Sequence, residues 1–144
     1  MKIEIKREKQ INQRFYIICS VVTGIIMILL LIEFFSRGAF VVSQISFFYI
    51  SLLLIYSLHK EFLRWLGEVK DRKGEYFVYT WIGMSLSLAL IDFFTQGYFT
   101  QTPKGEITST LGTLYSITIQ VGVIFVLTKF IKTINIITKR RFKI

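Results

Sequence analysis

Charged side chains are absent from four stretches of this chain, and these stretches indicate its architecture. They cover residues 15–32, 38–58, 76–91 and 107–128. About 20 residues of helix, rising roughly 1.5 Å each, cross a hydrocarbon layer of about 30 Å. The first and third stretches reach this length when the phenylalanine pairs beyond their terminal acids are counted. The pattern therefore predicts an all-α membrane protein with a four-helix transmembrane bundle. The predicted single domain covers 1–144, with spans at about 15–35, 39–59, 76–95 and 109–129.

Two other interpretations of the apolar stretches are less favourable. A soluble bundle of helices that are apolar all round would leave too little polar surface to face water. A cleaved signal peptide over residues 15–32 would need a cleavage site between small residues, and none follows at 33–37. We therefore expect the first stretch to be a retained transmembrane helix.

Lysine and arginine are divided unevenly among the segments outside the four stretches. The N-terminal tail, the second connection and the C-terminal tail have five, five and six of them, whereas the first and third connections have one each, Arg37 and Lys104. Positive charge resists translocation, so the basic side is expected in the cytoplasm. The distribution predicts an integral membrane protein with both termini cytoplasmic (N-in/C-in). The Lys-, Ile- and Phe-rich, Pro-poor composition points to the cytoplasmic membrane of a bacterium or archaeon.

Composition and net charge limit the kinds of partner that this protein is expected to bind. Apolar residues make up 53% of the chain and aromatic residues 16%, which excludes a disordered protein. A net charge of +9 would favour nucleic-acid binding in a soluble chain, but no known nucleic-acid motif accompanies it. We expect no nucleic-acid partner. The basic residues are expected to maintain topology and to attract anionic lipid headgroups.

The second and fourth spans continue as basic amphipathic segments, over about 60–73 and 130–143. Apolar side chains recur there at spacings of three and four, with charged residues between them. Such segments lie at the membrane surface or pack on a partner protein. The indole of Trp65 favours the surface, because Trp prefers the headgroup level. The expected lipid-interface residues are Arg64, Trp65, Lys139, Arg140 and Arg141.

The ends of the first and third spans are alike. Residues 31–40 align without gaps on residues 90–99, with six identical pairs of ten and two more that keep their chemistry (Glu/Asp and Ser/Thr). Gly24 meets Gly83 at the same offset. Both copies lie at the same end of helices that run in the same direction, so we predict two tandem parallel αα-hairpin repeats. The alternative is convergence, since spans that end in aromatic residues and a glycine turn can acquire similar sequences independently.

Glu33 and Asp92 are the acids associated with the predicted spans. Both lie about 26–28 Å along the helix from the charged residue that precedes their span, and so near the outer boundary of the membrane. Arg37, four residues beyond Glu33, is expected to pair with it on one helical face. Either the acids simply close their helices at the interface, or they face each other and bind a proton or cation. Gln44 and Ser85 would then border this site.

Small and polar residues recur in the fourth span. Gly112, Ser116 and Gln120 follow one another every four residues. Small residues let helices approach closely, and a Gln near mid-membrane requires a hydrogen bond from another helix. We expect Gly112 and Ser116, with Gly24 and Gly83, to be helix-packing positions within the bundle or against another subunit. A substrate contact at Gln120 is the alternative.

Residue combinations typical of enzymes are missing from the sequence. One histidine, His59, and one cysteine, Cys19, cannot ligate zinc, haem or an iron–sulfur cluster, and no phosphate-binding glycine loop precedes a helix. We expect no enzyme and no cofactor. The favoured function is a structural or accessory subunit that assembles with a second copy or another membrane protein. The alternative is a small oligomeric transporter, channel or lipid-handling protein that uses the outer carboxylate pair.

Overall fold

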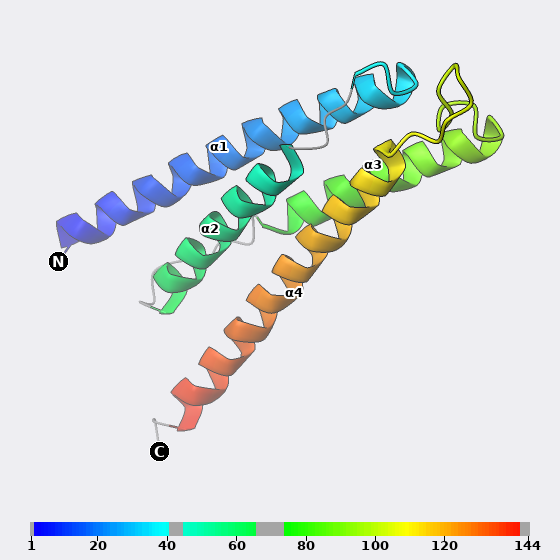
Figure 1. The fold of residues 1–144 in the computed structure, drawn as a ribbon. Coiled ribbons are helices and arrows are strands. Elements are labelled where there is room, and N and C mark those ends of the chain that lie inside the picture. Colours follow the sequence, from blue (N-terminus) through cyan, green and yellow to red (C-terminus); the bar gives the residue numbers. More distant parts are fainter. Residues whose placement is uncertain (1, 41–44, 66–73, 142–144) are drawn as a thin grey trace.

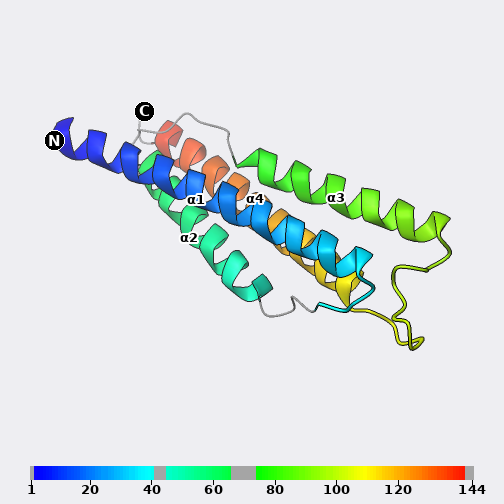
Figure 2. The ribbon, with the colours of Figure 1, turned by 90° about the horizontal axis from the view of Figure 1, so that it is seen from above.

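A computed structural model describes residues 2–40, 45–65 and 74–141, and it is all-helical apart from the connections. The four helices are α1 (Lys2–Phe35), α2 (Ile45–Trp65), α3 (Glu75–Phe94) and α4 (Thr110–Arg141). Successive helices run in alternate directions, and both termini lie at one end of the molecule (Figures 1 and 2). The turn after α1 and the loop before α4 lie at the other end.

Three of the four helices are long and apolar enough to cross a membrane. The qualifying segments are Gln10–Phe35, Glu75–Phe94 and Thr110–Ile134. They match three of the four predicted spans and indicate an integral membrane protein. For the remaining predicted span, 39–59, residues 41–44 lie outside the described part, and the uncharged portion of α2 runs from residue 45 to 58. The rest of α2 includes Lys60, Glu61 and Arg64.

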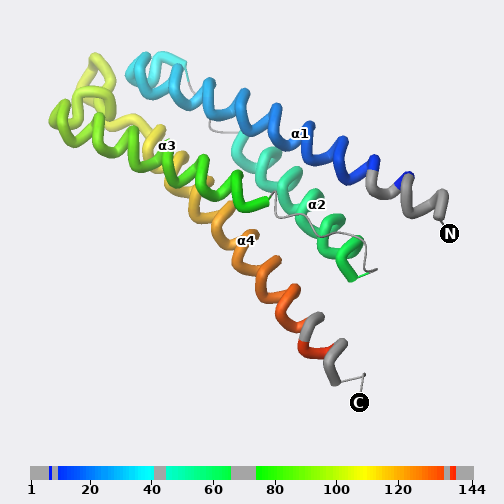
Figure 3. The backbone as a smooth tube through the Cα atoms, turned by 180° about the vertical axis from the view of Figure 1, so that it is seen from behind, coloured from blue at the N-terminus to red at the C-terminus, as the bar shows by residue number. Residues whose placement is uncertain are grey.

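Two helices continue well beyond the apolar stretches. α1 begins at Lys2 and α4 runs to Arg141, so they contain 34 and 32 residues. At about 1.5 Å per residue each is roughly 50 Å long, more than the hydrocarbon layer requires. α4 shows no bend where its basic segment begins (Figures 1 and 3). The basic end of α4 therefore continues along the helix axis, whereas a segment lying on the membrane surface would need a turn.

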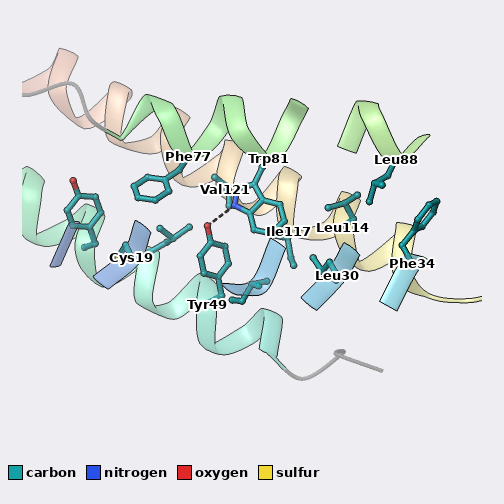
Figure 4. Packing of buried hydrophobic residues seen from close by; sticks show 13 residues of the cluster. Cys19, Leu30, Phe34, Tyr49, Phe77, Trp81, Leu88, Leu114, Ile117 and Val121 are labelled. Carbon is teal, nitrogen blue, oxygen red and sulfur yellow. Dashed lines mark hydrogen bonds between the residues drawn. The ribbon is translucent and has the colours of Figure 1, made fainter. Parts of the chain in front are cut away.

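The core lies around α4, which packs against the other three helices. The largest fully buried side chains include Trp81, Tyr49 and Phe34, from three different helices (Figure 4). Many large apolar side chains point outward instead, such as Phe47 at 84% and Leu86 at 61% exposure. An outer surface of this kind is unfavourable in water and suits contact with lipid.

A chain of hydrogen bonds crosses the core and joins three helices. Trp81 Nε1 donates to the Tyr49 hydroxyl over 2.6 Å (Figure 4), and that hydroxyl lies 3.0 Å from Thr23 Oγ1. Thr23 in turn donates to the Cys19 carbonyl over 2.6 Å. The Trp81 ring nitrogen and the Tyr49 and Thr23 hydroxyls thus each have a partner, which is required in a dry interior. This contact was not predicted from the sequence, although a Tyr and a Trp within apolar spans are a signal for one.

Candidate functional site

A buried carboxyl group joins the end of α1 to the beginning of α4. Glu33 is 3% exposed, and Thr110, the first residue of α4, is 1% exposed. The Thr110 hydroxyl donates a hydrogen bond to Glu33 Oε1 over 3.0 Å. Next to Glu33, the fully buried Phe34 packs its ring against Phe99 with a centroid distance of 5.3 Å. Glu33 therefore belongs to a packed contact between two helices and the loop that connects α3 with α4.

Arg37 does not pair with Glu33, contrary to the expectation from their spacing. α1 ends two residues before Arg37, whose φ is 56°, so the two side chains no longer share a helical face. The Arg37 guanidinium instead donates to the carbonyls of Gln101 and Thr102, over 2.8 and 3.3 Å. It also lies 4.3 Å from the centre of the Tyr98 ring. Arg37 thus attaches the turn after α1 to the loop after α3.

The two helix ends that align in sequence adopt the same turn. After α1, four successive backbone amides donate to carbonyls three to five residues earlier, at 2.9–3.3 Å. After α3, the four equivalent amides make the equivalent bonds at 2.9–3.2 Å. Arg37 and Gln96 have φ of 56° and 54°, and Gly38 and Gly97 follow with 77° and 78°. Positive φ strains most side chains, so a glycine in this helix-ending turn is favoured.

Asp92, the counterpart of Glu33, has different surroundings. It is partly buried, and its Oδ1 atom is enclosed without a hydrogen-bond partner among the described residues. Ser85, on the same side of α3, is 2.6 Å from the hydroxyl of Thr118 on α4. Within the described part of the chain, no hydrogen bond joins Asp92 to Glu33. Gln44 lies outside that part, so a shared site stays a prediction.

The expected helix-packing positions lie on the outer surface of the fold. Gly112, Ser116 and Gln120 of α4 are exposed, and so are Gly24 of α1 and Gly83 of α3. No atom of another helix lies within 4 Å of a Cβ built on any of the three glycines. Packing within the bundle therefore does not occur at these glycines. Contact with another subunit stays a prediction.

Gln120 is the most polar side chain of this exposed α4 surface. Its Nε2 donates to Ser116 Oγ over 3.1 Å, one turn earlier on the same helix. Both residues belong to the part of α4 that is apolar enough to span a membrane. A side-chain amide has two N–H donors and one carbonyl acceptor, so this single bond leaves one donor and the acceptor of Gln120 available for a partner.

The end of α2 has its charged face inward and its aromatic face outward. Lys60 and Glu61 are 7% and 6% exposed, whereas Phe62 and Trp65 are 65% and 57% exposed. Arg64 donates to Glu61 within the helix. Trp65 thus faces outward, and its contact with lipid stays a prediction. The side chains of Lys139, Arg140 and Arg141 lie outside the described residues.

In the described ranges, no three His, Cys, Asp or Glu side chains come together in a way that could hold a metal ion. Comparisons with protein-family models, with curated proteins and with solved structures find no match to this chain.

Proposed function

We propose that this protein is a non-enzymatic structural or accessory subunit of a membrane assembly, which associates with its partner through the outer surface of α4. The same proposal places four spans in the membrane, as two tandem parallel hairpins with cytoplasmic termini. Three apolar helices, the shared position of the termini and the matching turns after α1 and α3 support it. The divided basic charge supports the orientation.

The observation that carries the proposal is the outward position of Gln120 and Ser116. Their helix is otherwise apolar enough to cross a membrane, so these polar groups face lipid in a single copy. Lipid offers neither donors nor acceptors, whereas a second helix can provide both. Gly112, two turns earlier, has no atom of another helix near it and would allow a close approach. An interface with a second helix would give Gln120 and Ser116 hydrogen-bond partners and would use the close approach that Gly112 allows.

A second copy of this chain is the partner that fits best. Across a two-fold axis each Gln120 amide can donate to the carbonyl oxygen of its symmetry mate and accept from the mate's amide. The hydrogen bonds of Gln120 are then made between two identical surfaces, and no different protein is needed. Such interhelical bonds contribute about 1–2 kcal/mol each in model peptides, roughly a 5- to 30-fold change in association.

The association is tested with purified protein in bilayers, by counting subunits through single-molecule photobleaching. Wild type is expected to be dimeric, and Gln120→Leu is expected to weaken association at least 5-fold. Thr80→Val is the matched control, because Thr80 is exposed on α3 and its hydroxyl donates to the Tyr76 carbonyl of its own helix. A monomeric wild type that also copurifies with no other membrane protein would overturn the proposed function.

Topology is tested separately with accessibility tags. A tag at Ser36 and a tag at the C-terminus are expected in different compartments, because four spans put the termini opposite the first connection. Tags in the same compartment would remove the four-span topology.

One observation favours the second candidate, a small transporter or channel. Asp92 Oδ1 is enclosed without a hydrogen-bond partner in the described residues, and a proton or a cation would satisfy it. In liposomes, Asp92→Asn would then abolish cation-dependent flux, and Glu33→Gln would impair it. If the wild-type protein forms the dimer but conducts no flux, the transporter candidate is excluded and the assembly function remains.

A further inference from the structure

A pocket lies between the second half of α2, the beginning of α3 and the second half of α4. These parts of the helices are on the same side of the molecule as both termini (Figure 1). The volume of the pocket is about 70 Å³. Part of its wall is formed by apolar core residues, including Leu53, Phe77 and Val121, the last two of which appear in Figure 4. The lining also includes four basic and two acidic side chains: Lys60, Arg64, Lys129, Lys132, Glu61 and Glu75.

Both acidic side chains are already engaged by a cation. Arg64 donates to Glu61 Oε1, and Lys129 donates to Glu75 Oε1 over 2.5 Å. Lys132 also lines the pocket, is partly buried, and has no carboxylate partner in the described part of the chain. The pocket therefore has an excess of positive charge next to an apolar wall.

A second polar group of the lining lacks a partner. Glu61 is 6% exposed, and its Oε2 atom is enclosed without a hydrogen bond among residues 2–40, 45–65 and 74–141. This oxygen requires a donor, whereas Lys132 requires an anion. A ligand that combines a phosphate with a nearby hydroxyl meets both requirements.

We propose that this pocket binds the headgroup of an anionic phospholipid of the glycerol-phosphate type. The phosphate contacts Lys132 and Lys129, and the Glu61 side chain turns toward the pocket so that Oε2 accepts a hydrogen bond from a headgroup hydroxyl. The pocket is too small for acyl chains, so these lie along α4 beyond the surface of Gly112, Ser116 and Gln120, where Val126 and Phe130 are 64% and 62% exposed. The α4 segment that can span a membrane ends at Ile134, two residues past Lys132, which places the lysine near the headgroup level.

The proposal is tested on the full chain in neutral detergent, by native mass spectrometry during titration with defined lipids. Wild type is expected to bind phosphatidylglycerol in preference to phosphatidylcholine. Lys132→Gln is expected to weaken phosphatidylglycerol binding about 5-fold, since one lysine at the headgroup level contributes about that factor. Ser57→Phe, which fills the pocket without changing its charge, is expected to abolish the preference.

Arg14→Gln is the matched control. It removes one positive charge from an exposed position of α1 that does not line the pocket, so it leaves binding unchanged if the site is specific. Equal losses of phosphatidylglycerol binding in Arg14→Gln and Lys132→Gln would show a general attraction of the lipid to positive charge, and would overturn the proposed site. Displacement of the lipid by millimolar inorganic phosphate would assign the pocket to a soluble anion instead. Helical circular dichroism confirms that each variant is folded, so unchanged binding by folded Ser57→Phe and Lys132→Gln also overturns the proposal.

Discussion

Residues 31–40 after α1 and residues 90–99 after α3 share six of ten residues and the same hydrogen-bonded turn, but they differ in what surrounds them. Phe34 is 0% exposed, whereas its counterpart Phe93 is 76% exposed. Glu33 accepts a hydrogen bond from α4, whereas one oxygen of Asp92 has no hydrogen bond in the described residues. Local sequence thus specifies the turn, and the neighbouring helix decides whether the end is buried.

The difference arises from the position of α4. Its first residue, Thr110, lies against the end of α1, and the loop that leads to it covers Phe34. Among the described residues nothing covers Phe93 and Phe94 at the end of α3 in this way, and both are exposed. Two similar helix ends therefore need not have similar environments, because a single following helix can cover only one of them.

The largest effect is expected from removing the buried ring. Phe34→Ala should lower the free energy of unfolding by about 3 kcal/mol, since it leaves a cavity in a packed contact. Phe93→Ala should change it by less than about 0.5 kcal/mol, because the side chain is exposed. Unfolding in mixed detergent micelles, followed by loss of helicity, measures both. Equal effects would show that the two ends are buried alike.

The second-largest effect on stability is expected from removing the hydrogen bond that Thr110 of α4 donates to Glu33. Thr110→Val keeps the shape of the side chain but leaves Glu33 Oε1 without this donor, which should cost about 1–3 kcal/mol. Asp92→Asn should have little effect on stability, because no hydrogen bond is lost from the partly buried carboxyl group. The same micelle titration measures these variants. A neutral Thr110→Val would mean that the carboxyl group is satisfied elsewhere.

The third comparison separates backbone strain from packing. Gly38→Ala and Gly97→Ala should each cost about 1 kcal/mol, because both glycines have positive φ. Gly38→Ala should cost more of the two, since its new Cβ would lie 3.0 Å from Thr108 Cγ2. At Gly97 the nearest atom would be Thr100 Oγ1 at 3.4 Å. Thermal unfolding in detergent ranks the pair, and a larger loss at Gly97 would contradict this ranking.

The smallest effect is expected from exchanging the residues that differ in the two turns. Arg37→Gln removes the bonds to Gln101 and Thr102, and it should destabilise the protein by about 0.5 kcal/mol, because the bond to Gln101 is exposed. Proteolysis in the loop after α3 should become faster, because the loop loses this attachment. Gln96→Arg should leave the proteolysis rate unchanged, because Gln96 is exposed. Unchanged cleavage in Arg37→Gln would show that the loop holds its shape without the arginine.

The sequence by itself determined the four helices, three of which are apolar enough to span a membrane, and the glycine positions of the two turns. These features depend on local patterns of apolar residues and on the backbone freedom of glycine, which a single sequence reveals. The pairing expected for Arg37 was wrong, because α1 ends at Phe35 and the positive φ of Arg37 takes its side chain off the helical face of Glu33.

Only the tertiary structure decided which side chains meet across helices. It joined Trp81 to Tyr49, buried Glu33 beneath Thr110, and turned Gln120 outward. In a span that is apolar on every side, periodicity does not indicate the face that packs inward, because lipid and protein interior are both apolar. The choice of face depends on how the four helices are arranged around α4, and that arrangement follows from the shapes of many side chains together.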